Sequence, residues 1–450
     1  GFGAEYGNAL GCVLNEVKKT GATDRGLRLT AYAGGQDLRS AVAEIGAGTP
    51  GGFNYYASSI VQRNDYSGTP LIRSQVYDDS VVKLVWPGEK DSVTLLGLTG
   101  TLHGDLGDMF PLSGDYMKQK YAMVGAIWSH NFNSNSFLAV RPYYIHVSAV
   151  QSILNNYGMS IDATSDQLGL TAAYTNQLND RQLLKLGGSV LGSNNDQFTI
   201  MGGPWAHNDV NTFQTSLYAE QQAKFADKWT ANIGGRYESI TYDRTGRAYV
   251  AGDGETPGGY TGDWVPDVTE SGLMPRLGLS YAQDSKTVWK VSWGKYMKFV
   301  PANTVQTVYV YPDDPYAEAY QGGIGSTSPQ RATIADISFE RQISDSMAFR
   351  ITPYYSNFSH LGVFAPDPDN PDIVTYQDLG TAKARGVEFL LRRKASDNLQ
   401  GWLSYTYATI KSAEAGGPMQ YTSWDRRHTI SLVADYKAGK CAHILRADLG

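Results

Sequence analysis

The chain has 450 residues, a net charge of -6, two cysteines and a mean hydropathy of -0.34. Charged residues make up only 18% of it, below the roughly 25% of soluble domains, whereas aromatic residues reach 12%. No apolar run approaches the ~18 residues of a membrane helix and no basic patch favours nucleic acid, so a helical membrane protein is excluded while a membrane β-barrel, which needs one apolar residue in two, is not.

The first 21 residues, GFGAEYGNALGCVLNEVKKTG, differ from the rest of the chain. They are rich in glycine and end in an apolar-polar run, and they lack the basic start and apolar core of a signal peptide. Because the chain does not begin with Met, we expect that an N-terminal portion precedes it. Cys12 lies in this stretch and Cys441 near the other end, and their spacing leaves open whether they are bonded.

From about residue 26 onward, apolar and polar residues alternate with a period of two. In residues 228–240, Trp229, Ile233 and Tyr237 alternate with polar residues such as Arg236 and Glu238. Such alternation predicts half-apolar strands, here about twice as long as those of soluble sandwiches. Since neighbouring side chains on a strand point to opposite faces, one set is expected to face lipid and the other a lumen. The same pattern occupies residues 213–225, 288–296, 346–355 and 384–394.

The predicted connections between strands alternate in length. Short polar turns and long Gly-, Pro- and Asp-rich segments follow one another, which is typical of outer-membrane barrels with periplasmic turns and external loops. We predict roughly eighteen to twenty-one strands of this kind. The short turns are 133–136, 178–180, 225–228, 282–286, 343–346 and 394–398, and the long segments are 101–117, 194–211, 242–270, 298–329 and 411–426.

Aromatic residues gather within and at the ends of the predicted strands. Amphipathic rings are favoured at the level of the lipid headgroups, although aromatic residues are also good strand formers in general. We expect these residues to form the girdles of a barrel. They are Tyr143, Tyr144, Trp289, Trp293, Tyr354, Tyr355, Tyr405 and Tyr407.

Polar residues that alternate with lipid-facing ones are the general candidates for contact with a ligand. A wet barrel interior must be polar in any case, so pairing with one another is an equally simple role. Loop aromatics could stack on a flat or sugar-like ligand, or could simply pack within their loops. The inward candidates are Arg236, Glu238, Lys290, Arg350, Glu388 and Arg392, and the aromatic candidates are Trp205, Tyr260 and Trp264.

Signals for catalysis and for bound metal are weak. The chain has no Gly-x-Ser-x-Gly, His-Glu-x-x-His or phosphate-loop motif. Its seven histidines are scattered singly. The acidic stretches APDPDNPD (365–372) and VYPDDPYAEAYQGG (310–323) carry hard oxygen ligands of the kind that Ca²⁺ takes, but they lack the glycine and distal Glu of an EF-hand. We therefore expect no catalytic residues, no cofactor and no metal site.

The stretch EYGNALGCVLNEVKKTG (5–21) resembles the end of the plug domain of TonB-dependent outer-membrane receptors. In that family a Tyr-Gly pair, a small-residue turn, a Gly-Gly pair and an apolar strand ending in Lys and Gly lead into the barrel. Tyr6-Gly7, Gly11, residues 13–15 and residues 18–21 follow this order, with Cys12 in place of the second Gly. Further segments resemble barrel strands of the family: MPRLGLSY (274–281), SWGKYMKFVPANTV (292–305), LGTAKARGVEFLLRRK (379–394), LQGWLSYTYATIKS (399–412) and SWDRRHTISLVADY (423–436).

The resemblance implies an all-β fold, a transmembrane antiparallel β-barrel of the large outer-membrane transporter type with about 22 strands. Residues 1–22 would be the end of the plug domain, and residues 23–450 the barrel without its closing strands. The chain is thus expected to be incomplete and part of a longer receptor.

The resemblance also implies a location in the bacterial outer membrane and no enzymatic activity. The expected function is energy-coupled uptake of a scarce bulky solute such as a ferric siderophore, cobalamin or an oligosaccharide. The expected partners are outer-membrane lipid, a TonB-type energy-coupling protein that acts through the plug, and an extracellular small-molecule or oligosaccharide ligand, but no nucleic acid. A passive porin-like channel and an adhesive outer-membrane barrel are the alternatives, and neither needs the plug-like opening.

Overall fold

The computed structural model describes residues 2–35, 37–65, 72–106, 115–152, 159–201, 204–250, 259–261, 267–302, 326–366, 374–396, 398–414, 416–438 and 441–449. Within these ranges the chain has no helix that is both long and apolar enough to cross a membrane.

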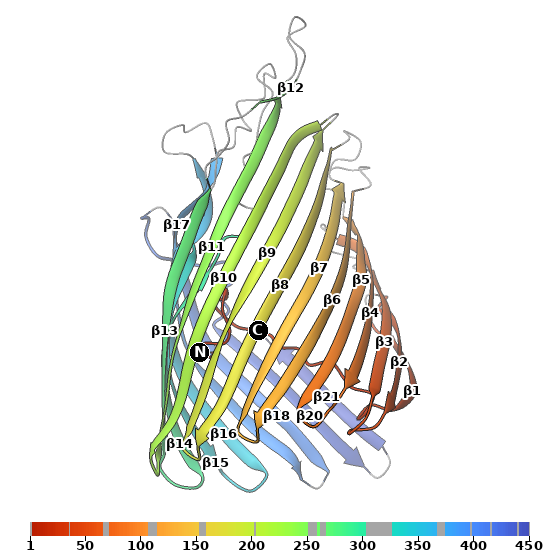
Figure 1. Cartoon of the computed structure of the whole chain (residues 1–450). Helices are drawn as coiled ribbons and strands as arrows, with labels where there is room; N and C mark the ends of the chain where they lie inside the picture. The colour runs from red at the N-terminus through yellow and green to blue at the C-terminus, as the bar shows by residue number, and fades with distance from the viewer. Residues whose placement is uncertain are drawn as a thin grey trace, which may run out of the picture.

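The strands form one antiparallel sheet that curls around a lumen, with short turns at the lower end of the view in Figure 1. Each long strand pairs with its neighbours in the sequence, while β12 and β19 are short additions to β11 and β18. Among the described residues no pairing joins β1 to β21. The strands are β1 (Gly26–Ala33), β2 (Arg39–Gly48), β3 (Asn54–Asp65), β4 (Ile72–Trp86), β5 (Asp91–Leu106), β6 (Tyr116–Asn133), β7 (Ser136–Ser152), β8 (Met159–Asn179), β9 (Gln182–Met201), β10 (Pro204–Ala226), β11 (Trp229–Val250), β12 (Gly259–Thr261), β13 (Val268–Ala282), β14 (Thr287–Lys298), β15 (Gln330–Gln342), β16 (Met347–Pro366), β17 (Val374–Ser396), β18 (Leu399–Ala413), β19 (Gln420–Tyr421), β20 (His428–Ala438) and β21 (Cys441–Leu449).

The two faces of the sheet have the composition that the sequence predicts. On β11, Ile233 is 60% exposed on the outside, whereas Glu238 is fully buried on the inside. Leu217 of β10 lies opposite Tyr237 and is 67% exposed on the same outer face. Exposed apolar side chains recur on this face along neighbouring strands, and a contiguous apolar surface of this kind marks a surface that a membrane or a partner covers. The predicted all-β antiparallel fold, with apolar residues outside and polar residues inside, is confirmed.

Outward aromatic residues form a row close to the short turns. The ring of Trp289 lies 4.5 Å from that of Phe339, which lies 5.7 Å from Phe349, which in turn lies 6.4 Å from Phe389. These residues come from four successive strands, β14 to β17, so the row runs along the barrel wall. Its position agrees with the predicted girdle at one membrane surface.

Two tyrosines assigned to the girdle face the lumen instead. Tyr143 directly precedes the outward Tyr144, and Tyr354 directly precedes the outward Tyr355. Adjacent residues on a strand must point to opposite faces. Each inward ring lies over a glycine of the neighbouring strand. A Cβ atom on Gly169 would lie 2.1 Å from the ring of Tyr143, and one on Gly386 would lie 2.9 Å from the Tyr354 hydroxyl. These glycines provide the space for the inward rings.

The predicted long loop at 194–211 is wrong, because both flanking strands continue through it. β9 runs to Met201, β10 begins at Pro204, and Asn195 lies opposite Val210 in regular register. These strands reach beyond the ~10 residues needed to cross a bilayer. Above the membrane both faces of the sheet meet water, so polar residues sustain strand pairing there. The six short turns predicted from sequence are confirmed by the strand bounds.

Because the outer face meets lipid, we predict that Ile233→Lys destabilises the barrel by about 2–4 kcal/mol in a bilayer. Thr230→Lys, on the inward face of the same strand, is expected to have much less effect, because the new charge would lie in the polar lumen. Urea unfolding of the chain in lipid vesicles, followed by tryptophan fluorescence, measures both. Equal destabilisation by the two variants would contradict the assignment of faces.

Candidate functional site

The N-terminal segment (residues 2–23) crosses the lumen of the barrel. Its first residues contact β10 to β14, and its last residues contact β2 to β4 on the other side of the lumen, where Lys19 pairs with Glu44. The Lys83 ammonium donates a hydrogen bond of 3.0 Å to the carbonyl of Lys18. In Figure 1 this segment is the red-brown trace that runs from the N-terminus behind the front strands to β1.

A buried ion pair on β11 holds the start of this segment. Arg236 donates to Glu238 over 2.7 Å, and their side chains are 8% and 0% exposed. The guanidinium also donates to the carbonyls of Ala4 and Glu5, at 3.4 and 3.3 Å. The second carboxylate oxygen of Glu238 accepts the backbone N–H of Asn8 at 3.1 Å. Both charges are therefore compensated by each other and by the backbone of the segment.

A second pair of charged residues holds the same backbone from the neighbouring strands. Arg276 of β13 donates to the carbonyls of Phe2, Gly3 and Tyr6, the last at 2.7 Å. Its guanidinium lies 4.8 Å from the centre of the Phe2 ring, within cation-π range. Glu220 of β10 accepts the N–H of Ala4 at 2.6 Å. We call Glu220, Arg236, Glu238 and Arg276 the anchor.

Gly7 and Asn8 allow the backbone of the segment to lie close to the anchor. A Cβ atom on Gly7 would lie 1.9 Å from a carboxylate oxygen of Glu238 and 2.1 Å from Nε of Arg236, so the close approach requires glycine. Asn8 follows with a φ of 50°, a left-handed conformation that Asn tolerates better than most residues. Its amide oxygen accepts the N–H of Phe299 at 2.8 Å, which links the segment to the residues after β14.

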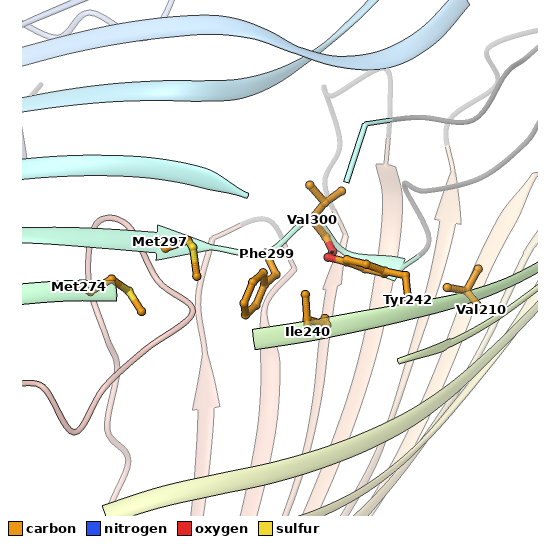
Figure 2. Close-up of a cluster of buried hydrophobic side chains, with 7 residues drawn as sticks. All are labelled: Val210, Ile240, Tyr242, Met274, Met297, Phe299 and Val300. Atoms are coloured by element: carbon orange, nitrogen blue, oxygen red, sulfur yellow. Dashed lines mark hydrogen bonds between the residues drawn. The ribbon is translucent and has the colours of Figure 1, made fainter. Parts of the chain in front are cut away.

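The residues after β14 fold inward and pack on the lumen wall. Phe299 and Val300 join an apolar cluster with Ile240 and Tyr242, and the Tyr242 hydroxyl donates to the Val300 carbonyl at 2.7 Å. Figure 2 shows this cluster, which also contains Val210, Met274 and Met297. The inward fold narrows the lumen on the loop side of the segment.

The loop-side cavity, of about 440 Å³, lies between this inward fold and the stretch of lumen wall formed by β7 to β11. Phe299 and Val300 give it an apolar side. On the other side Ser165 donates to Asn195 at 2.8 Å, and the Asn195 amide donates to Ser193 at 2.6 Å. The cavity thus offers both apolar contacts and a row of neutral hydrogen-bonding groups.

The turn-side cavity, of about 720 Å³, has charged walls. Lys290 pairs with Glu340 at 2.9 Å, and Arg350 lies 3.9 Å from the same carboxylate. Glu388 also lines this cavity. Asn8 lines the loop-side cavity and Gly11 the turn-side cavity, so the N-terminal segment passes between them.

The structure places the predicted ligand-facing residues in different environments. Arg236 and Glu238 are buried against the N-terminal segment, whereas Arg350 and Glu388 line the turn-side cavity. Arg392 lies on the same inward face of β17 as Glu388, opposite Trp402. Trp205 lies in β10 and Tyr260 in β12, but the structure does not describe their side chains, and Trp264 lies outside the described residues.

Sequence reasoning missed half of the anchor. Arg276 lies within MPRLGLSY, which was noted only for its resemblance to a strand, and Glu220 lies in the alternating stretch 213–225 and was not singled out there. Alternation alone would have placed both in the lumen. Among the residues that the structure describes, no three His, Cys, Asp or Glu side chains gather as metal ligands. The acidic residues of 367–372 and 310–323 lie outside the described residues.

We predict that Arg276→Met loosens the start of the N-terminal segment, because three backbone carbonyls lose their charged donor. Hydrogen bonds to charged groups are worth about 1.5–3 kcal/mol each, so amide exchange at Ala4 and Asn8 should accelerate at least tenfold. Hydrogen–deuterium exchange by mass spectrometry of the full chain measures this. Arg350→Met is the matched control, since Arg350 contacts Glu340 and not the segment; equal acceleration by both would rule out a specific anchor.

Comparison with known proteins places the chain in a family. The family model described as TonB dependent receptor-like, beta-barrel, matches residues 24–443. A search among curated proteins found no match.

Solved structures share the fold at low sequence identity. The ferric-catecholate import receptor Fiu from E. coli K12, in its closed form, is 12% identical with a TM-score of 0.72, over 93% of this chain and 70% of that one. The alcaligin outer-membrane receptor FauA from Bordetella pertussis is 14% identical, with a TM-score of 0.67 over 93% and 66%. The copper transporter OprC is 13% identical, with a TM-score of 0.72 over 92% and 65%. The chain thus spans about two thirds of the length of these structures.

The family match covers nearly the whole chain, and the fold, the outward apolar face and the polar lumen agree with it. The chain belongs to the TonB-dependent receptors, a family of transporters, not enzymes, whose β-barrels lie in the bacterial outer membrane.

Proposed function

We propose that this chain forms the barrel and the end of the plug of a receptor that imports a scarce bulky solute by energy-coupled transport. Residues 1–22 are the end of the plug, and residues 23–450 belong to the barrel. The observation that supports this most directly is the anchor, which holds a peptide segment across the lumen between two cavities. A permanently open pore has no use for such a segment.

The anchor suits a segment that must move during each transport cycle. It binds mainly backbone carbonyls and N–H groups, with several hydrogen bonds of about 1.5–3 kcal/mol each. Such bonds can break one after another, and the exposed charges of Arg236 and Glu238 would then still pair with each other. We propose that a TonB-type energy-coupling protein supplies the pull from the turn side, through the plug.

The loop-side cavity is the proposed first binding place for the solute. Its volume falls within the roughly 300–1,000 Å³ range of small-molecule sites. Of the similar structures, Fiu is described as importing ferric catecholates, FauA as an alcaligin receptor and OprC as a copper transporter. For this chain we propose a ferric siderophore, cobalamin or an oligosaccharide. Arg350, Glu388 and Arg392 would then meet the solute along its path toward the turn side.

Uptake with and without energy coupling tests this proposal. The encoding gene is expressed in a bacterial strain that lacks its own receptors, either with or without its TonB-type protein. Labelled ferric catecholate, cobalamin and maltooligosaccharide are offered to the cells. We expect one of these solutes to accumulate only when the coupling protein is present.

Two other outcomes would contradict the proposal. Equal accumulation in both strains would favour a passive porin-like channel. Binding of the cells to an oligosaccharide-coated surface, without accumulation of any solute, would favour an adhesive barrel. A strain without the gene controls for leakage through other proteins.

A further inference from the structure

A row of cations crosses the outer face of the barrel from β14 to β18. Lys295 lies opposite Thr333, and Thr333 lies opposite Asn357. Asn357 lies opposite Lys383, and Lys383 opposite Lys411. Strand partners share a face, so five neighbouring strands contribute one continuous row of cationic and hydrogen-bonding side chains.

Two arginines flank this row on the same face. Arg331 lies two residues before Thr333 on β15, one outward position nearer the loops. Arg385 lies opposite Tyr355, one outward position nearer the turns than Lys383. All of these cations are exposed except Lys411, which is half-buried beside the ring of Tyr421 at 4.5 Å. We call Lys295, Arg331, Lys383, Arg385 and Lys411 the basic band.

The carboxylates of the same five strands do not neutralise the basic band. Asp336, Glu340 and Glu388 line the turn-side cavity, so they lie on the opposite face of the sheet. Asp378 lies 3.0 Å from His360 and is paired there. In the described parts of β14 to β18, every other outward residue is uncharged or cationic. In its described part, the outer face of this wall is therefore cationic, whereas the inner face carries charges of both signs.

The loop-side rim on β4 to β8 has a different distribution of charge. On β4 to β8 the outward face mixes signs, with Asp78 and Asp166 beside Lys118 and Lys120. Asp78 is hydrogen-bonded to Thr101, which lies opposite Lys120. The described outward face of β4 to β8 thus lacks the excess of positive charge found on β14 to β18, so the excess does not follow from a general rule for rim residues.

The basic band lies directly above the lipid-facing apolar surface. Val387 follows Arg385 by one outward position and is 41% exposed, and Val291 lies two outward positions below Lys295 and is 46% exposed. Lys and Arg at such a boundary extend their stems along the apolar surface and place their charges at the headgroups. Arginine matches phosphate oxygens with paired donors, and Thr333 and Asn357 add neutral donors between the charges.

We propose that the basic band binds phosphorylated headgroups of membrane lipid at the loop-side surface of the outer membrane. An anion there relieves the mutual repulsion of the cations, which no outward carboxylate in the described parts of β14 to β18 relieves. The band would orient the barrel and gather phosphorylated lipid on the β14–β18 side, whether or not a solute is transported.

Binding of lipid A with both phosphates, carried in phosphatidylcholine vesicles, tests this with the full chain. The variant Lys295→Gln/Lys383→Gln removes two charges from one row, and Lys118→Gln/Lys120→Gln removes two outward charges from the mixed rim. A juxtamembrane charge contributes about fivefold in affinity. We therefore expect the first variant to bind roughly 25-fold more weakly and the second to change less than about twofold.

Four results would overturn the proposal. Equal loss in both variants would mean that only net charge matters, and no loss in either would mean that the basic band does not bind. Unchanged binding of the wild-type chain to lipid A without phosphates would assign the contact to the apolar face alone. Competition by free inorganic phosphate at equal phosphate concentration would point to an anion site without lipid. Electrophoretic mobility before and after heating controls for folding of each variant.

Discussion

The structure depends on one constraint, which is that successive side chains on a strand point to opposite faces. On one side they meet lipid, where a charged or unpaired group is costly, and on the other a lumen where water and charge are tolerated. Each strand must satisfy both environments at every second residue. This is why Ile233 and Tyr237 lie outside while Arg236 and Glu238 lie inside on the same stretch of β11. The short turns, the register and the distribution of charge follow from keeping this alternation in phase over the whole sheet.

A polar lumen allows the wall to hold a peptide, and the anchor does so through the peptide backbone. Arg276 alone donates hydrogen bonds to three carbonyls, while Glu238 accepts the N–H of Asn8 and Glu220 accepts that of Ala4. A grip on the backbone needs few particular side chains in the segment, apart from the glycine that lets it come close. The Asn8 amide extends the same network to Phe299, and thus to the inward fold beside the loop-side cavity. Movement of the segment and the shape of that cavity are therefore physically connected.

Much of the fold was predictable from sequence, and much of the site was not. The alternation on 228–240 placed Ile233 and Tyr237 on one face and Arg236 and Glu238 on the other, as the structure has them, because face is a local property. Tyr143 shows the cost of ignoring it, since a residue next to an outward tyrosine cannot also face lipid. The role of Arg236 was not predictable, because its partners Ala4 and Glu5 lie more than 200 residues away in the chain. The prediction of a loop at 194–211 was wrong, because a polar composition indicates that both faces of the chain meet water and does not exclude strand pairing.

The same alternation also bears on the charge of the outer wall. Alternation decides which face a residue meets, but not which sign of charge it carries. In the described parts of β14 to β18, the inner face carries both signs, whereas the outer face is cationic. The inner face mixes Lys290, Glu340 and Arg350, which neutralise one another around a cavity. In its described part, the outer face has cations without acids at the level where apolar residues end. Ion pairs within the chain balance the first set, whereas the described outward residues of these strands offer no carboxylate to the second set. Anions outside the chain can balance it, and the proposed lipid phosphates are anions that the loop-side surface of a membrane supplies.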